Sequence, residues 1–329
     1  MNSDVDEGKF SACRNLIDLC RAELSKRLVS QNEVVDGILM AAFSGGHILL
    51  EGVPGLAKTL AIKSFADISG LDFKRIQFTP DLLPADVSGT LIYEQNSGKF
   101  SVRKGPVFTN IVLADEINRS PAKVQSALLE AMAEKQVTIG EDTFALPSPF
   151  MVLATENPIE QEGTYELPEA ELDRFLIKIK VSYPSPEDEV RIVKTNGKAS
   201  DIPLRKILDS EKIIAIRKIA ESVQCDDKII EYIVSIVNAT RPDKKIQKKQ
   251  GEISKYISFG ASPRAGIAML QCAKVQALFD GRSFVLPDDV KKCAVPVLRH
   301  RIVLSYEAAA DSVSSDELIE KILDLMPVP

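Results

Sequence analysis

The stretch GVPGLAKT, residues 52–59, decides the fold of this chain: Gly52, Val53, Pro54, Gly55, Leu56, Ala57, Lys58 and Thr59. It follows an apolar run at 47–50 that is typical of a short strand, and it leads into Leu60, Ala61 and Ile62, which continue as a helix. A strand, a glycine-containing turn and a Lys-Thr pair that opens a helix form the architecture of a phosphate-binding P-loop. We therefore predict a nucleotide-binding α/β domain around this stretch.

Each residue from Gly52 to Leu60 is a candidate contact for the phosphates of ATP, because successive backbone N–H groups of such a loop converge on phosphate oxygens. Lys58 is expected to reach the β- and γ-phosphates, and the Thr59 hydroxyl is expected to ligate Mg²⁺. Ala57 stands where the general pattern has a second glycine. A short match of this kind also arises by chance, so the rest of the chain has to supply the other parts of the site.

The composition describes an ordinary globular protein long enough for two domains, with 329 residues, 45% hydrophobic and 27% charged. Its apolar runs are only a few residues long and its N-terminus is polar and acidic. We therefore expect no membrane insertion, no signal peptide and a cytoplasmic location. The net charge of −6 and the pI near 5.3 argue against a dedicated nucleic-acid binder. Five scattered cysteines and two histidines argue against metal or redox chemistry built on these residues.

Five short apolar runs alternate with helical patterns, which predicts a parallel five-stranded sheet covered by helices on both faces. The runs are 47–50, 73–78, 111–114, 150–154 and 176–181. Two further segments, 90–102 and 136–146, predict β-hairpins around polar turns that contain glycine. After a double proline the pattern becomes helical. We therefore place an α/β nucleotide-binding domain, with N-terminal helices and both hairpins, at residues 1–183 and a smaller all-α lid domain at 184–329.

The third apolar run leads directly into two acids, Asp115 and Glu116. An apolar strand that ends in such acids is the second necessary part of a P-loop ATPase. The first acid holds Mg²⁺, and the second polarises the water that attacks the γ-phosphate. We therefore assign Asp115 to the metal and Glu116 to catalysis. The next run is followed by Asn157, which in this order of elements occupies the position that senses the γ-phosphate and orients the water.

The chain resembles the MoxR family of AAA+ ATPases. The resemblance rests on motifs that follow one another along nearly the whole chain, at 52–59, 79–89 (TPDLLPADVSG), 114–119 (ADEINR), 125–132 (QSALLEAM), 154–158 (ATENP), 167–175 (LPEAELDRF) and 260–265 (GASPRA). The family is similar to this chain at Ala57 as well, so the missing second glycine does not count against the P-loop.

The resemblance implies roles for three residues: Asn157 as the sensor-1 residue, Arg174 as the arginine finger that reaches a neighbouring subunit's γ-phosphate, and Arg264 as sensor 2 at the start of a lid helix. The chemistry agrees, because a guanidinium offers a fixed fork of donors to a phosphate that gains charge in the transition state. An ion pair with Asp173 or Glu171 is the alternative for Arg174. For Arg264 the alternative is a cap of the preceding turn.

The resemblance also implies a homo-oligomeric ring of six subunits that uses ATP and Mg²⁺ to remodel or mature a protein client, often with a partner that carries a von Willebrand factor A domain. Both hairpins match insertions that project toward the pore in such rings; surface decoration is the alternative. Two other functions stay open. A nucleic-acid-stimulated motor is disfavoured by the acidic charge and the lack of tryptophan. A nucleotide-gated scaffold is disfavoured by the intact Lys58, Asp115 and Glu116.

Overall fold

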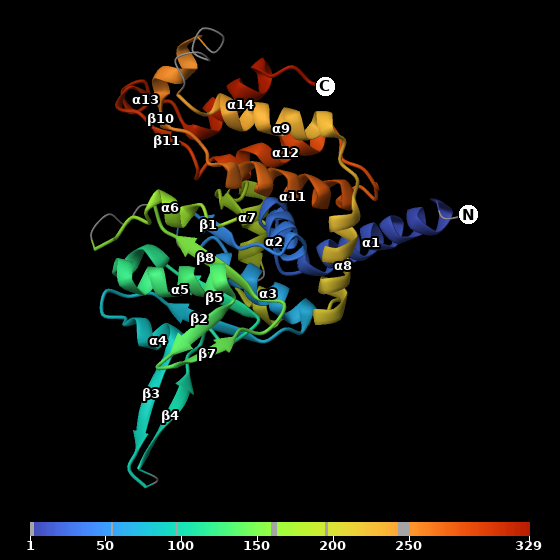
Figure 1. Ribbon diagram of the computed structural model, residues 1–329. Coiled ribbons are helices and arrows are strands. Elements are labelled where there is room, and N and C mark those ends of the chain that lie inside the picture. Colours follow the sequence, from blue (N-terminus) through green and yellow to red (C-terminus); the bar gives the residue numbers. More distant parts are fainter. Residues whose placement is uncertain (1–2, 54, 97, 159–162, 195–196, 243–250) are drawn as a thin grey trace. The chain divides into compact units, whose positions relative to one another are not determined.

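The structure is a computed structural model that describes residues 3–53, 55–96, 98–158, 163–194, 197–242 and 251–329. None of the helices in these ranges is long and apolar enough to cross a membrane. The elements follow one another along the chain (Figure 1) as α1 (Ser3–Leu24), α2 (Asn32–Ser44), β1 (Ile48–Glu51), α3 (Lys58–Ser69), β2 (Phe73–Gln77), α4 (Pro84–Ser88), β3 (Gly89–Glu94), β4 (Lys99–Lys104), β5 (Ile111–Asp115), η1 (Ile117–Arg119), α5 (Ala122–Glu134), β6 (Gln136–Ile139), β7 (Asp142–Ala145), β8 (Met151–Glu156), α6 (Glu169–Leu172), β9 (Ile177–Lys180), α7 (Pro186–Lys194), η2 (Lys198–Asp201), α8 (Ser210–Ser222), α9 (Asp227–Ala239), η3 (Gly251–Tyr256), β10 (Ile257–Phe259), α11 (Pro263–Phe279), α12 (Pro287–Leu298), β11 (Val303–Leu304), α13 (Tyr306–Ala310) and α14 (Ser315–Leu325).

The five predicted strands form one parallel sheet with the order β2-β5-β8-β1-β9. This confirms the predicted α/β fold, and each strand end lies within two residues of its predicted position. Because β1 lies between β8 and β9, the loop that follows β1 leaves the sheet from its interior rather than from an edge. Ligands of open parallel sheets bind outside the carboxyl ends of the strands, so this loop is well placed to bind one.

Helices cover both faces of the sheet. On one face, Val112 of β5 and Val152 of β8 join a buried cluster that includes Leu128 of α5. On the other face α2 packs closely at Gly37, where an added Cβ would lie 2.9 Å from Cγ1 of Ile179. Side chains alternate between the two faces along each strand, and strands buried on both faces read as the continuous apolar runs seen in the sequence.

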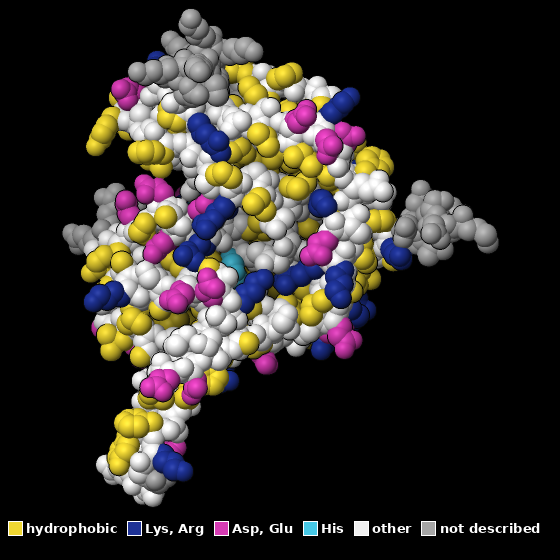
Figure 2. Space-filling view, viewed as in Figure 1, with side chains coloured by type: hydrophobic (Ala, Val, Ile, Leu, Met, Phe, Trp, Pro, Cys, Tyr) yellow, Lys and Arg dark blue, Asp and Glu magenta, His cyan; other side chains and the backbone are white. Residues whose placement is uncertain are grey.

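Both predicted hairpins are present. β3 and β4 pair as an antiparallel ribbon, from Gly89 opposite Lys104 to Glu94 opposite Lys99, and β6 pairs with β7 in the same way. The β3–β4 ribbon projects from the sheet (Figure 1), and hydrophobic side chains lie along its surface (Figure 2). The ribbon is therefore a separate projection rather than part of the central sheet.

The chain forms two compact units. The sheet unit comprises Asp18–Phe175 and Ile179–Ile214, and the helical unit comprises Met1–Ile17, Leu176–Lys178 and Ala215–Pro329. The sheet unit thus continues past the predicted domain boundary, and the division between residues 183 and 184 stays a prediction.

The helical unit is built on α9, α11, α12 and α14, which pack against one another. It also contains a short antiparallel ribbon in which Ile257 of β10 lies opposite Leu304 of β11. The sequence did not predict this ribbon within the helical lid. Strands of two or three residues are too short to show the alternation that identifies a strand in a sequence.

Candidate active site

The register of the sheet brings several strand ends to one edge. β1 and β8 end level with each other, with Glu51 opposite Glu156, and β2 and β5 end level with each other, with Gln77 opposite Asp115. Parallel strands point the same way, so the residues that follow these ends meet at the carboxyl edge of the sheet. The P-loop and the predicted acidic pair therefore lie at the same edge.

The P-loop begins against the backbone of its neighbouring strands. The N–H of Gly52 donates to the carbonyl of Glu156 at 3.1 Å, and an added Cβ at Gly52 would lie 2.9 Å from the carbonyl oxygen of Val181. Gly55 adopts φ +86°, and its α-carbon faces open space, with nothing within 4 Å of an added Cβ. The loop thus needs glycine once for close packing and once for its backbone conformation. Pro54 lies outside the described residues.

Ala57 takes the place of the second glycine and adopts the conformation that a glycine there would favour, with φ 58° and ψ 16°. An L-residue in this left-handed region costs about 1–2 kcal/mol. Ala57 is the N-cap of α3 and makes no side-chain cap. The Ala57 side chain therefore does not cap the first-turn N–H groups of α3, which include those of Lys58, Thr59 and Leu60. A helix end that binds an anion needs N–H groups that no side chain caps.

Lys58 lies between the P-loop and the end of β8. Its ammonium donates to the carbonyl of Gly52 and, at 3.2 Å, to the carbonyl of Glu156. Burial lowers the pKa of Lys58, while the nearby carboxylates of Asp115 and Glu116 oppose that shift. The ammonium is thus held in a half-buried position beside the acidic pair.

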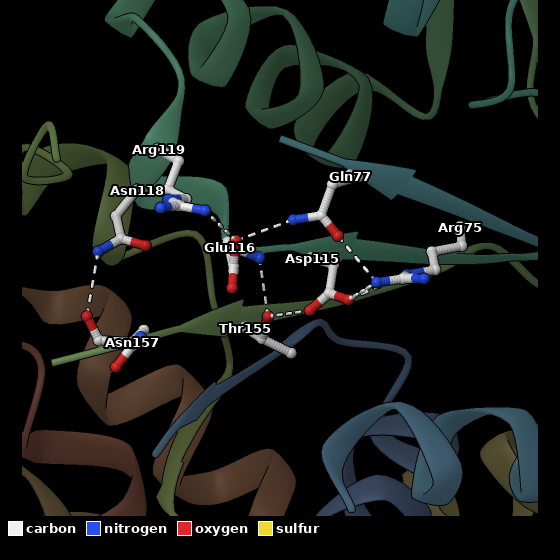
Figure 3. Close-up of polar contacts among 8 residues, drawn as sticks. All are labelled: Arg75, Gln77, Asp115, Glu116, Asn118, Arg119, Thr155 and Asn157. Atoms are coloured by element: carbon white, nitrogen blue, oxygen red, sulfur yellow. Dashed lines mark hydrogen bonds and ion pairs between the residues drawn. The ribbon is translucent and has the colours of Figure 1, made fainter. Parts of the chain in front are cut away.

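A buried threonine joins the two acids (Figure 3). Thr155 lies on β8 with no exposed surface, and its hydroxyl donates to Oδ1 of Asp115 at 2.7 Å. The hydroxyl oxygen of Thr155 in turn accepts the backbone N–H of Glu116 at 2.8 Å. One hydroxyl therefore fixes the side chain of the first acid and the backbone of the second. We call this arrangement the Thr155 bridge.

Glu116 has a left-handed backbone, with φ 57° and ψ 52°, immediately after β5. Its side-chain oxygen Oε2 accepts a hydrogen bond from Nε2 of Gln77 at 2.9 Å and forms an ion pair with Nη1 of Arg119 at 3.1 Å (Figure 3). Two donors from different elements therefore orient the predicted catalytic carboxylate.

Arg75 joins the acids by a second path. Its Nε and Nη2 reach Oδ2 of Asp115 at 3.0 and 2.7 Å, and Nη2 also donates to Oε1 of Gln77 at 2.8 Å. Since Gln77 in turn donates to Glu116, the contacts run without a break from one acid to the other across the end of β2 (Figure 3). The side chain of Asp115 is only 12% exposed, which strengthens its ion pair with Arg75 relative to a surface pair.

Comparison with known proteins agrees with this geometry. The model of the ATPase family associated with various cellular activities (AAA) matches residues 47–177, and the model of the AAA lid domain matches residues 250–322. The chaperone MoxR1 of Mycobacterium tuberculosis is 47% identical, over 93% of this chain and 81% of its own length. This chain belongs to the MoxR family of AAA+ ATPases.

Two further proteins resemble this MoxR-family chain along its length. The uncharacterised protein YeaC of Bacillus subtilis is 42% identical, over 93% of this chain and 92% of its own length. The crystal structure of a candidate ATPase from Cytophaga hutchinsonii is 47% identical, with a TM-score of 0.90 over 100% of this chain and 99% of that one. The fold is therefore shared with this solved structure.

The other predicted site residues of this MoxR-family ATPase lie in different places. Asn157 is buried just after β8, and its carbonyl accepts from Nδ2 of Asn118 at 3.5 Å, beside the acidic pair (Figure 3). Arg174 is exposed, and its Nη1 donates to the carbonyl of Leu129 in α5 at 3.1 Å. Arg264 belongs to the helical unit, in the first turn of α11, where its backbone N–H is capped by Ser262. The structure thus brings Asn157 to the acids and attaches Arg174 to α5.

The residues at the strand ends fit Mg²⁺ and ATP. Mg²⁺ is usually held by one or two protein oxygens together with substrate phosphates, rather than by a cage of side chains. The Thr59 hydroxyl and the Asp115 carboxylate supply such oxygens. Oδ1 of Asp115 retains a lone pair beside the bond that it accepts from Thr155, whereas Oδ2 accepts two bonds from Arg75. Lys58 supplies the positive charge that the phosphates need.

Sequence reasoning missed three residues of this network: Arg75, Gln77 and Thr155. Thr155 was part of a recognised motif, and the other two lie on β2, but none has a residue type that by itself indicates a site. The register could have found two of them, because Gln77 lies opposite Asp115 and Thr155 follows Ala154, which lies opposite Ala114. A search for polar residues level with the acids on neighbouring strands would have given Gln77 and Thr155, but not Arg75, which lies opposite Leu113.

Proposed function

We propose that this chain is a Mg²⁺-dependent ATP hydrolase that works as a ring and remodels or matures a protein client. The observation that carries the proposal is the network around the acids: the Thr155 bridge and the path through Arg75 and Gln77 hold Asp115 and Glu116 in fixed positions beside Lys58. Preorganised charges at the place where charge develops are the largest single contribution to many enzymatic rates. A scaffold that binds nucleotide without turnover would not need a positioned base.

Each residue has a defined part in this proposal. The backbone N–H groups at the start of α3 and the ammonium of Lys58 bind the phosphates of ATP, and Thr59 and Asp115 would hold Mg²⁺. The metal supplies charge neutralisation on the phosphates. Glu116 accepts a proton from the attacking water, and Asn157 orients that water. Because Gln77 and Arg119 both donate hydrogen bonds to Oε2 of Glu116, we propose that the other oxygen, Oε1, accepts the proton from the attacking water.

The ring completes the site between subunits. Arg174 is exposed, and its guanidinium donates a hydrogen bond to the backbone of α5. That bond holds the guanidinium in position while a neighbouring subunit can still reach it. In the proposed hexamer it supplies the arginine finger, and Arg264 of the lid acts as sensor 2 within its own chain. An arginine finger contributes about 10³–10⁵ in turnover in related phosphoryl-transfer enzymes.

The client is proposed to be a protein rather than a nucleic acid. The chain is acidic overall, and its two hairpins are placed on the sheet unit as separate ribbons. The relative named Chaperone MoxR1 supports a client-maturing role. A partner with a von Willebrand factor A domain remains part of the proposal.

The proposal is tested by measuring ATP turnover per subunit while the protein concentration is raised through the micromolar range, together with the mass of the assembly. Turnover that climbs cooperatively as larger assemblies form supports shared sites. Glu116→Gln is the matched control: the amide keeps a hydrogen-bond acceptor but cannot take up a proton, so ATP binding should persist while turnover falls by about 10²–10⁴. Unchanged turnover in Glu116→Gln removes Glu116 from its role, and turnover that is the same in monomers and assemblies removes the shared site.

A further inference from the structure

The β3–β4 ribbon has one apolar face. Its register sets Leu91 opposite Val102 and Tyr93 opposite Phe100, and side chains alternate along each strand, so these residues share one face. Three further cross-strand pairs share the opposite face, which is mostly polar: Thr90 with Arg103, Ile92 with Ser101, and Glu94 with Lys99. An isolated two-stranded ribbon is only marginally stable, so an apolar face on such a ribbon needs a partner.

The base of this face already has its partner within the sheet unit. Leu91 packs at the turn of the β6–β7 hairpin, where an added Cβ at Gly140 would lie 2.7 Å from Cδ1 of Leu91. On the neighbouring strand, Nζ of Lys104 lies 4.9 Å from the ring centre of Phe108 and 5.0 Å from that of Phe144. These contacts attach the ribbon firmly to the nucleotide-binding unit.

The far end of the face has no such cover. Tyr93 is 55% exposed and Phe100 is 69% exposed, and their rings pack against each other with centroids 5.3 Å apart. Figure 2 shows hydrophobic side chains along the projecting ribbon. A rigid pair of aromatic rings presented to solvent is the kind of surface that anchors protein interactions, because aromatic rings bury a large area at a small cost in side-chain entropy.

The charge of the ribbon indicates which partner fits. Residues 89–104 contain Lys99, Arg103 and Lys104 but only one acid, Glu94, a net charge of +2 within a chain whose total charge is −6. Lys99 and Arg103 are exposed on the polar face. A positive projection on a negative molecule favours an acidic partner.

We propose that the ribbon, through the Tyr93–Phe100 pair on one face and Lys99 and Arg103 on the other, binds an extended segment of the protein client in which aromatic or large aliphatic side chains alternate with acidic ones. The inference rests on the proposed function, since it specifies which kind of client segment the proposed ATPase binds. An extended segment suits the ribbon because β3 and β4 form a sheet of two strands, so each offers an edge to which a third strand can pair. Alternation then places the apolar side chains on the aromatic pair and the carboxylates on the opposite, basic face.

The test uses the full-length protein and a short fluorescein-labelled peptide that alternates Asp or Glu with Phe or Leu, followed by fluorescence anisotropy. Two control peptides replace the acids by Lys or the apolar residues by Ser. The double variant Tyr93→Ser/Phe100→Ser removes the aromatic pair, Lys99→Glu reverses one charge, and Tyr183→Ser is the matched control, since Tyr183 is an exposed aromatic residue (70%) elsewhere on the sheet unit. Circular dichroism and thermal unfolding check the fold of each variant.

We expect the wild type and Tyr183→Ser to bind the acidic apolar peptide equally. The double variant should lose about tenfold or more in affinity, as truncated hot spots do. Lys99→Glu should weaken binding of the acidic peptide, and added salt should weaken it too. Equal binding of the Lys-containing peptide, or no loss in the folded double variant, overturns the inference. So does a double variant that changes self-association rather than peptide binding, because the occupant is then a second copy.

ATP turnover of the wild type, measured on the same preparation, keeps the two proposals separate. Turnover without peptide binding overturns the inference and leaves the ATPase proposal standing. Peptide binding that depends on Tyr93 and Phe100 in a protein without turnover overturns the ATPase proposal and keeps the binding surface.

Discussion

Thr155→Val removes one buried hydroxyl and leaves a side chain of nearly the same shape, so it isolates the Thr155 bridge. Two hydrogen bonds disappear. The bond to the Asp115 carboxylate involves a charged acceptor and is worth about 1.5–3 kcal/mol, and the bond that accepts the Glu116 N–H is worth about 0.5–1.5 kcal/mol. We therefore expect the sheet unit to lose about 2–4 kcal/mol of unfolding free energy. Thr155→Ser keeps the hydroxyl and should lose only about 1 kcal/mol, for one buried methyl group.

The catalytic effect of Thr155→Val should exceed the effect on nucleotide binding. Lys58 and the P-loop are untouched, so ATP should still bind, whereas Glu116 loses the bond that holds its left-handed backbone. A displacement of about 1 Å at a catalytic group costs about 10²-fold in turnover. Urea unfolding, ATP binding and turnover are measured for both variants, with amide hydrogen exchange at Glu116 as a local readout. Equal turnover in Thr155→Val and Thr155→Ser would refute the bridge as a positioning device, even if stability falls as expected.

Arg174→Ala should keep nucleotide binding, and when mixed with wild type it should lower turnover below the value for independent subunits; a rate that follows the wild-type fraction linearly contradicts an inter-subunit role. Ala57→Gly should raise the free energy of unfolding by up to about 1 kcal/mol, because glycine adopts the left-handed backbone of residue 57 without strain. Ala57→Val should lower the free energy of unfolding, and the opposite order in thermal unfolding would show that this conformation is unstrained. Hydrogen bonds from Lys26 and from the N–H of Arg205 hold the pKa of Glu23 at about 2, below its ordinary 4.5. A lowered pKa stabilises the fold above about pH 4.5, so the stability difference between wild type and Glu23→Gln should shrink as pH falls from 4.5 toward 2; a constant difference in urea titrations excludes the shift.

The central sheet could be predicted because its strands are buried on both faces and therefore appear as continuous apolar runs. β8 shows where that signal ends. It was predicted over 150–154 and extends to Glu156, because Thr155 and Glu156 continue the pairing with β1 although both are polar. Polar residues at a strand end read as a turn in a sequence, and only the pairing with the next strand shows otherwise.

The contacts of the acids were less accessible to sequence reasoning. Arg75 and Gln77 lie on β2, an edge strand in which only Ile76 is buried, so they resemble ordinary surface positions in the sequence. Their importance comes from partners about 40 residues along the chain, Asp115 for Arg75 and Glu116 for Gln77, which the parallel register of β2 and β5 brings close. Local patterns predict elements, whereas contacts between distant residues depend on how the strands pair.

The left-handed backbones of Ala57 and Glu116 have the same physical cause. Five non-glycine residues of the described chain have positive φ, namely Ser30, Ala57, Glu116, Lys135 and Ser312. Successive side chains of an extended strand point to opposite faces, so an extended Glu116 would direct its carboxylate away from that of Asp115. The left-handed turn at Glu116 lets neighbouring acids join one network through Gln77 and Arg75. Ala57 likewise turns the loop so that α3 begins at Lys58. Strain at both positions is thus a consequence of placing adjacent residues on one proposed phosphate site.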